Sequence, residues 1–256
     1  MTLRARMRAV LVLFVSASGL ATGCGAASSL PGRPAPPAAS HRLRTSAAPT
    51  AAARAATARK PAAAPTRPAH HGPARQLITV TTRGHGATYA TLTAYAGRPG
   101  GWHRVLGPWT ARIGRNGFAP PGRKREGDGR TPSGSFGIQF FFGVLANPGV
   151  RFTYRRIHPY DFWDDDPASP RYNEWVDQRR ASPGTSPEPM DVSGYDYGAV
   201  IGYNTTRVPG LGSGIFLHVN IGIATAGCIT LPMGKLLTVL RWLDPARSPR
   251  IKMGAT

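Results

Sequence analysis

The amino-acid composition changes near residue 75, and only the residues after this point can form a folded domain. From Gly25 to about Arg75 the sequence consists mainly of Ala, Pro, Ser, Thr and Arg, with almost no large apolar side chains. Such a segment cannot bury enough apolar surface to offset the chain entropy lost on folding. We therefore expect a disordered, partly extended tether over residues 24–75 and one folded domain over residues 76–254.

The first 23 residues have the layout of a secretory signal. Three arginines precede an apolar stretch over residues 9–20, which is too short for a membrane span. The next segment, Ala21-Thr22-Gly23-Cys24, resembles a bacterial lipobox, in which cleavage leaves an acylated Cys24 as the new amino terminus. The alternatives are an ordinary signal peptide cut nearby and a Cys24–Cys228 disulfide, which would silence a nucleophilic thiol. We expect an exported protein that is anchored to lipid through Cys24, or otherwise secreted.

Positive charge is concentrated ahead of the domain. Residues 1–75 hold eleven of the 32 Lys and Arg residues and none of the 12 Asp and Glu residues. A basic tether suits anionic lipid or an anionic cell-wall polymer. Nucleic acid is the competing partner for so basic a chain, but we find no helix-turn-helix, zinc-finger spacing or aromatic RNA-binding motif. With export expected, we predict no nucleic-acid partner, and Arg123-Lys124-Arg125 borders an anionic substrate or is solvated.

Short strand-like segments separated by Gly and Pro dominate the chain from Gln76 onward. The clearest cover residues 77–81, 88–95, 136–140, 199–203 and 214–220. Apolar residues at helical spacing after Pro232 predict one short helix. Residues 155–191 form a long polar and aromatic insertion, either a lid over a cleft or a surface excursion. Together these patterns predict a mainly β, two-sheet, β-sandwich-like fold with that helix on one side.

A histidine and the only cysteine of the domain lie close together in sequence. Strand alternation places His218 on the face opposite to Leu217 and Val219, so that it looks into a cleft while the apolar face is buried. A thiol attacks a carbonyl only as thiolate, and His218 is the candidate base for Cys228. An activated Cys228 should then be alkylated well below pH 8. The alternative is a small buried cysteine beside a core histidine.

The residues around Cys228 add the remaining parts of an acyl-transfer site. Gly227 allows a tight turn, and consecutive N–H groups there hold an oxyanion, with Thr225 as a further supporting residue. The helix after Pro232 would direct its positive end toward Cys228 and favour the thiolate.

These residues resemble the YkuD-type L,D-transpeptidase catalytic domain. Its signature is a histidine followed by Ser/Thr-x-Gly-Cys-Ile/Val-Arg-Leu/Met, and here His218 precedes Thr225-Ala226-Gly227-Cys228-Ile229-Thr230-Leu231. Thr230 departs from the usual arginine, and the interval from His218 to Cys228 is shorter than in the best-known members. Upstream, residues 113–117 and Gly127-Asp128-Gly129-Arg130-Thr131-Pro132-Ser133-Gly134 resemble the segments with which this domain opens. The resemblance covers residues 76–252 and is strongest to an exported, actinobacterial-like branch.

The resemblance implies an enzyme of peptidoglycan metabolism. Cys228 would attack the stem tetrapeptide, release D-alanine and form a thioester, which an amine resolves into a 3→3 cross-link, with His218 as base and acid. It also implies that a backbone carbonyl orients His218. The alternatives are an L,D-carboxypeptidase that uses water, a non-catalytic wall-binding lipoprotein, and an exported cysteine peptidase.

Four more residues are candidate substrate-binding positions. Tyr203 and Asn204 end a predicted strand, where they either line the cleft or cap the strand, and Arg130 and Thr131 lie in the 127–134 segment. We predict no metal site, because Asp164-Asp165-Asp166 lacks alternating ligands and a turn glycine. We predict no cofactor, because residues 127–134 lack the Gly-Lys-Ser/Thr ending of a phosphate loop. The sequence carries no signal for an oligomeric state.

Overall fold

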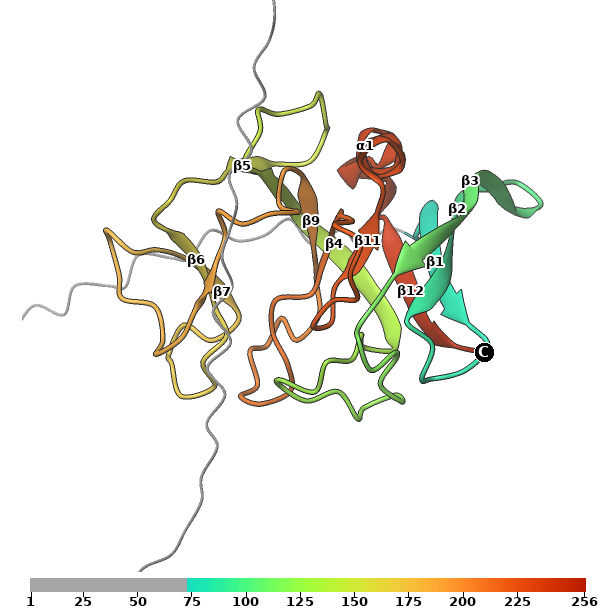
Figure 1. The fold of residues 1–256 in the computed structure, drawn as a ribbon. Coiled ribbons are helices and arrows are strands. Elements are labelled where there is room, and N and C mark those ends of the chain that lie inside the picture. The colour runs from blue at the N-terminus through green and yellow to red at the C-terminus, as the bar shows by residue number, and fades with distance from the viewer. Residues whose placement is uncertain (1–72) are drawn as a thin grey trace, which may run out of the picture. The chain divides into compact units, whose positions relative to one another are not determined.

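The structure is a computed structural model that describes residues 73–256 (Figure 1). The expected signal peptide, the lipobox at Cys24 and the tether to residue 72 lie outside the described residues. Among residues 73–256, no helix has both the length and the apolar character needed to cross a bilayer.

Nine strands form one mixed sheet, in the order β12-β1-β2-β3-β11-β10-β9-β4-β5. Because β12 also pairs with β4, eight of these strands close into a ring and β5 is added outside it. The two packed layers expected from the sequence are therefore halves of one continuous sheet. The strands are β1 (Gln76–Thr82), β2 (Tyr89–Arg98), β3 (Gly101–Arg112), β4 (Gly134–Gly143), β5 (Tyr154–Arg156), β9 (Gly198–Ile201), β10 (Phe216–Val219), β11 (Ile229–Leu231) and β12 (Arg250–Ala255).

The mainly β prediction is confirmed, and each strand expected from the sequence is present within a few residues of its predicted bounds. The long β3 was missed because its side chains are mostly exposed and it contains Pro108, which argues against a strand. Its pairing with β2 is irregular there, since the register shifts between Leu92 and Ala94. A bulge of this kind accommodates a residue that has no N–H to donate.

The helix expected after Pro232 is α1 (Met233–Trp242), with Pro232 at its N-cap position. Leu236, Val239 and Leu240 form its buried face and join the main hydrophobic core inside the sheet. A 3₁₀ turn (Pro245–Arg247) then leads into β12. Packing against β10 and β11 fixes α1 beside the two strands that bracket Cys228.

The insertion at residues 155–191 builds a second layer of structure. It contains β6 (Asp161–Asp164), β7 (Glu174–Asp177) and β8 (Glu188–Pro189), which form a separate three-stranded sheet in the order β7-β6-β8. In Figure 1, β6 and β7 lie to the side of β9, away from β1–β3. A second hydrophobic cluster joins Trp163 and Met190 of this region to Phe216 and Cys228. The insertion is therefore a packed wall beside the sheet rather than a loose excursion.

Candidate active site

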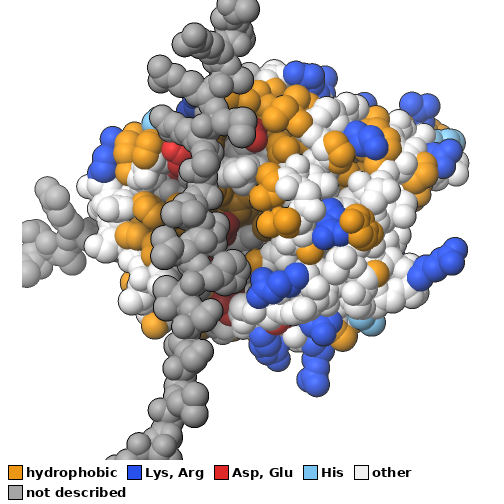
Figure 2. All heavy atoms as spheres, in the orientation of Figure 1, with side chains coloured by type: hydrophobic (Ala, Val, Ile, Leu, Met, Phe, Trp, Pro, Cys, Tyr) orange, Lys and Arg blue, Asp and Glu red, His pale blue; other side chains and the backbone are white. Residues whose placement is uncertain are grey.

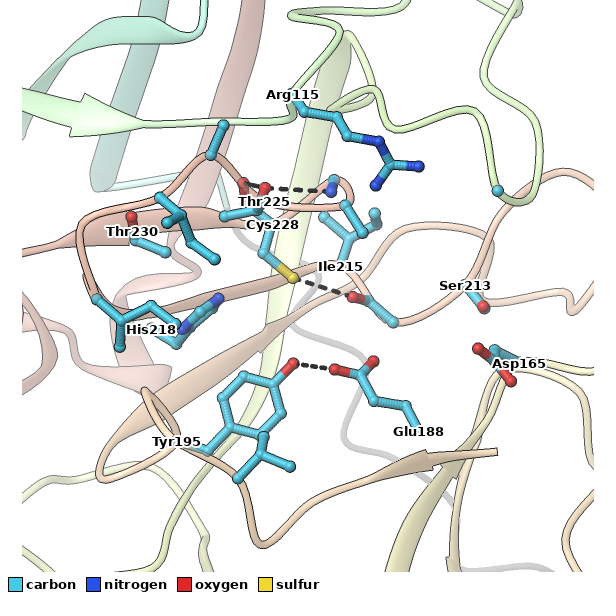
Figure 3. Close-up of a pocket in the computed structure, with 18 of the residues that line it drawn as sticks. Arg115, Asp165, Glu188, Tyr195, Ser213, Ile215, His218, Thr225, Cys228 and Thr230 are labelled. Atoms are coloured by element: carbon cyan, nitrogen blue, oxygen red, sulfur yellow. Dashed lines mark hydrogen bonds between the residues drawn. The ribbon is translucent and has the colours of Figure 1, made fainter. Parts of the chain in front are cut away.

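A cavity of about 470 Å³ lies between the large sheet and the insertion. Cys228 and His218 line it together with the carboxylates of Glu126, Asp165 and Glu188. Figure 3 shows the labelled members of this set around the cavity. Val192, Ile221 and Ile223 form an exposed apolar rim. The cavity brings together sequence segments from residue 115 to residue 230.

Cys228 is held immediately before β11, which runs parallel to β10. Its side chain is a free thiol and only 8% exposed. The thiol donates a hydrogen bond to the Gly214 carbonyl at 3.2 Å, and the Phe216 N–H donates to Sγ at 3.3 Å. Both partners lie where the chain enters β10, so the sulfur is fixed against the strand that carries His218.

His218 points away from the main core, as strand alternation predicted. Leu217 and Val219 belong to that core, whereas Phe216 packs in the second cluster and His218 lines the cavity. Its Nδ1 lies 3.2 Å from the Gly194 carbonyl and 3.1 Å from the Val219 carbonyl. Carbonyl oxygens only accept hydrogen bonds, so we assign the proton to Nδ1. Nε2 is then left as an acceptor.

Burial favours the uncharged forms of both Cys228 and His218 over a thiolate–imidazolium ion pair. It raises the pKa of the Cys228 thiol well above its ordinary value, and the charge of Glu188 acts in the same direction. Burial also lowers the pKa of His218 to about 4, against the two carbonyl hydrogen bonds. At neutral pH the resting pair is therefore a thiol and a neutral imidazole. The dipole of α1 does not offset this, because β11 separates Cys228 from the helix and the dipole acts only near its first turn.

We predict that Cys228 in the native chain is alkylated slowly at neutral pH, opposite to the expectation from sequence. At pH 7.5 iodoacetamide should modify it at least about tenfold more slowly than in urea, where the thiol has its ordinary pKa of about 8.5. The native rate should still rise above pH 9. Mass spectrometry of the peptide that contains Cys228, from pH 6 to 10, measures this. Faster modification in the native state at pH 7.5 would show a preformed thiolate.

Thr225 and Gly227 shape the turn that leads to Cys228. The Thr225 hydroxyl donates to the Cys228 carbonyl at 2.7 Å and accepts from the Gly227 N–H at 3.1 Å. The Gly227 N–H is thus already used, whereas no described residue accepts a hydrogen bond from the Cys228 N–H. Space at position 227 is tight, since an added Cβ would lie 3.0 Å from the Arg130 carbonyl oxygen. Both residues support the loop, and the oxyanion donor best placed by this arrangement is Cys228 itself.

An acidic wall that no sequence pattern predicted lines the cavity beside the thiol. Glu188 accepts a hydrogen bond from the Tyr195 hydroxyl at 2.5 Å, and the edge of that tyrosine ring packs on His218. Burial, followed by nearby carboxylates, raises the pKa of Glu188 to about 7 and that of Asp165 to about 6. Glu126 is the third carboxylate of the wall. These carboxylates were missed because Asp165 and Glu188 of the insertion, and Glu126 of the loop before β4, meet Cys228 only after folding.

The basic loop at residues 123–125 is solvated only in part. Arg123 and Arg125 are exposed, but Lys124 is 5% exposed and lines the cavity. Its Nζ lies 2.7 Å from Asp128 and 2.6 Å from the Arg125 carbonyl oxygen. Asp128 also accepts from the backbone N–H groups of Arg125 and Arg130, which explains the aspartate in the Gly-Asp-Gly segment.

The four candidate substrate-binding residues lie outside the cavity lining. Thr131 is fully buried and accepts the Gly114 N–H, while Arg130 donates to the Phe118 carbonyl. The Tyr203 hydroxyl donates to the Leu211 carbonyl. Asn204 bonds to both Val208 and Gly212. For Tyr203 and Asn204 these contacts agree with the second alternative, a capping role at the end of β9, rather than a place in the cleft.

The aspartates at 164–166 have different roles from one another. Asp164 and Asp166 accept hydrogen bonds from neighbouring N–H and hydroxyl groups, including those of Ser169 and Thr185, so their oxygens hold turns of the insertion. Asp165 alone turns into the cavity. Within residues 73–256, no group of three or more His, Cys, Asp or Glu side chains has a geometry that could hold a metal ion.

Comparison with known proteins identifies the domain. Residues 88–251 match the family model YkuD, the L,D-transpeptidase catalytic domain. No curated protein matches the chain. Among solved structures, the chain is similar to the helical cell shape determining protein Pgp2 from Campylobacter jejuni, at 14% identity and a TM-score of 0.35. That match covers 71% of this chain and 48% of the Campylobacter jejuni chain, so the present chain spans about half of that protein's length.

Proposed function

The chain belongs to the YkuD family of L,D-transpeptidase catalytic domains, which act on peptidoglycan, and we propose that it is itself a peptidoglycan L,D-transpeptidase with residues 76–254 as its catalytic domain. The observation that carries the proposal is the placement of Cys228 and His218 in one cavity, with Nε2 of the imidazole free to accept a proton.

In the first half of the reaction the thiol is activated only as it attacks. His218 Nε2 takes the Sγ proton while sulfur bonds to the carbonyl carbon between the diamino acid at stem position three and the terminal D-alanine. The Phe216 N–H stabilises negative charge on sulfur. The Cys228 N–H, which no described residue accepts, is the proposed oxyanion donor. The imidazolium then gives its proton to the departing D-alanine nitrogen. A thioester and free D-alanine result.

In the second half, a side-chain amine of a neighbouring stem attacks the thioester. His218 accepts a proton from the attacking nitrogen and returns one to sulfur as the C–S bond breaks. The product is a 3→3 cross-link. Acyl-thioesters react readily with amines, which suits cysteine to this transfer. If water enters instead, the same site acts as an L,D-carboxypeptidase.

Action on peptidoglycan places the catalytic domain outside the cytoplasm. We propose that residues 1–23 direct export and that Cys24 carries a lipid anchor, with residues 24–75 as the tether. The excess of Lys and Arg in residues 1–75 would hold this tether near anionic lipid or an anionic wall polymer.

The test is incubation of the full chain with a disaccharide-tetrapeptide ending in D-alanine, followed by mass spectrometry of protein and products. We expect a thioester adduct at Cys228 with release of D-alanine, and no adduct in Cys228→Ala. A cross-linked product indicates transpeptidation, and a tripeptide product alone indicates carboxypeptidation. A folded chain that gives neither adduct nor product would support the wall-binding alternative.

A further inference from the structure

A second hollow of the domain lies where the chain enters β1. It has a volume of about 760 Å³ and is lined by the end of β2, the start of β3, Trp242 of α1 and Arg247 of the 3₁₀ turn. In Figure 1 the β2–β3 hairpin projects from the side of the sheet away from β6 and β7. This hollow, here called the hairpin groove, shares no residue with the catalytic cavity.

Hydrogen bonds at its base fix the walls of the hairpin groove. The Arg75 N–H donates to the Arg247 carbonyl at 2.9 Å, and the Gly97 N–H donates to the Arg75 carbonyl at 2.8 Å. Gln76 is 2% exposed, and its side-chain amide donates to the Trp242 carbonyl at 2.8 Å. These bonds tie the start of β1 to the hairpin and to the end of α1. The groove is therefore preformed, which lowers the entropy cost of binding a ligand in it.

The charged side chains of the hairpin groove are all positive. Arg75, Arg98 and Arg247 are exposed, and none of them forms an ion pair within residues 73–256. No Asp or Glu of these residues lies in the lining. A groove lined by one sign of charge concentrates its counter-ions, and the planar fork of arginine binds a carboxylate or phosphate through two N–H groups. The groove therefore suits a ligand that carries several negative charges.

Two tryptophans add flat apolar surfaces to these cations. Trp102, in the first turn of β3, is 45% exposed, and Trp242 is half-buried at the end of α1. The face of an indole ring carries partial negative charge, so it attracts the C–H groups on the flat side of a sugar ring. A smaller hollow shares Trp242 and Arg247 with the groove and adds Arg151. The aromatic and basic surface thus extends beyond one hollow, as the binding of a polymer requires.

Positive charge continues from the groove into the preceding sequence. Arg75 is the last of the eleven Lys and Arg residues within residues 1–75, a segment without Asp or Glu. In Figure 2 the acidic side chains lie toward the left and centre of the face, whereas Lys and Arg side chains stand over the hairpin and α1 on the right. The hairpin end of this face is therefore complementary in charge to a polyanion.

We propose that the hairpin groove binds an anionic polysaccharide, with Trp102 and Trp242 against its sugar rings and the three arginines on its carboxylate or phosphate groups. The family acts on peptidoglycan, so the domain works outside the cytoplasm, among wall polymers rather than nucleic acid. An anionic membrane is the less suitable partner, because both tryptophans line a hollow instead of forming a projecting apolar surface. The groove holds the domain on the wall independently of the catalytic pair.

Binding of a defined polymer tests the proposal. The full chain is titrated calorimetrically with polygalacturonate, each ring of which carries a carboxylate, at about 0.15 M salt to screen diffuse attraction. We expect the double variant Arg98→Gln, Arg247→Gln to bind at least about tenfold more weakly, and Trp102→Ala about fivefold more weakly. The double variant Arg83→Gln, Arg123→Gln is the matched control, because it removes the same charge from exposed positions outside the groove. An equal loss in both double variants, or no loss in Trp102→Ala, overturns the proposal.

Two further measurements separate the groove from a membrane site and from the proposed function. Vesicles of phosphatidylglycerol and phosphatidylcholine should bind the wild-type chain and Trp102→Ala equally, and a loss confined to vesicle binding would identify a membrane site and overturn the proposal. Thioester formation from the tetrapeptide donor should be unchanged in Arg98→Gln, Arg247→Gln, since the groove and the catalytic cavity share no residue. A loss of thioester formation as large as the loss of polymer binding would indicate general damage and contradict a separate site. A wild-type chain that forms no thioester but shows the expected polymer affinities refutes the transpeptidase proposal and supports the groove.

Discussion

Replacement of His218 by alanine is expected to slow thioester formation about 10³-fold, within the range for loss of a positioned general base. The reason is specific to this cavity. Burial keeps Cys228 protonated at neutral pH, so attack requires a base that removes the proton during the reaction. Pre-steady-state mass spectrometry of the adduct, with the tetrapeptide donor at saturation, measures the rate.

The pH profile gives this prediction a second readout. The pKa of His218 is about 4, so the imidazole is neutral and able to accept a proton above about pH 5, and the wild-type rate should be level from there to pH 8. In His218→Ala only the directly ionised thiol reacts, so its rate should rise with pH throughout this range. His158→Ala is the control, because His158 is a half-exposed histidine of the insertion outside the cavity lining. A wild-type rate that rises with pH up to pH 8, as expected for the variant, would contradict the general-base role of His218.

The largest effect on stability is expected at Gly117. Its φ is +71°, and a Cβ at this position would lie 1.8 Å from the His85 carbonyl oxygen. That oxygen accepts the Phe118 N–H, and the Gly117 carbonyl accepts the Thr131 N–H, so the backbone cannot move without loss of hydrogen bonds. We expect Gly117→Ala to lower the free energy of unfolding by about 4 kcal/mol or more, as for other substitutions that force strain into a fixed backbone. Urea unfolding at 25 °C measures it.

Gly122 provides a matched control for that variant. It has the same φ of +71°, but no atom lies within 4 Å of the position of its Cβ. Gly122→Ala therefore isolates the cost of a left-handed conformation, which we expect to be about 1 kcal/mol. The difference between the two variants reports the clash with residue 85. If both variants lose the same free energy of unfolding, the backbone around the His85–Phe118 hydrogen bond can shift at little cost. The loop in which Arg115 pairs with Thr225 would then be easily deformed.

Much of the fold was predictable because it depends on local patterns. The alternation in β1 and the apolar spacing of α1 reflect which face of each element is buried, and both patterns are visible in consecutive residues. The closure of the sheet was not predictable. It depends on β12 pairing with both β1 and β4, which lie far away in sequence and carry no mark of their partner.

The candidate site likewise has a part that could be predicted from sequence and a part that depends on the folded structure. Sequence alone marked Cys228 and His218, because one motif holds both and the chemistry of a thiol and an imidazole is intrinsic to those residues. The groups that surround this pair are determined by the tertiary structure. The insertion carries Asp165 and Glu188 to the thiol, burial sets the protonation of the pair, and the Gly194 carbonyl selects the tautomer of the imidazole. Pairwise chemistry can be read from residue types, but electrostatics depends on distance and solvent exposure, which exist only once the chain has folded.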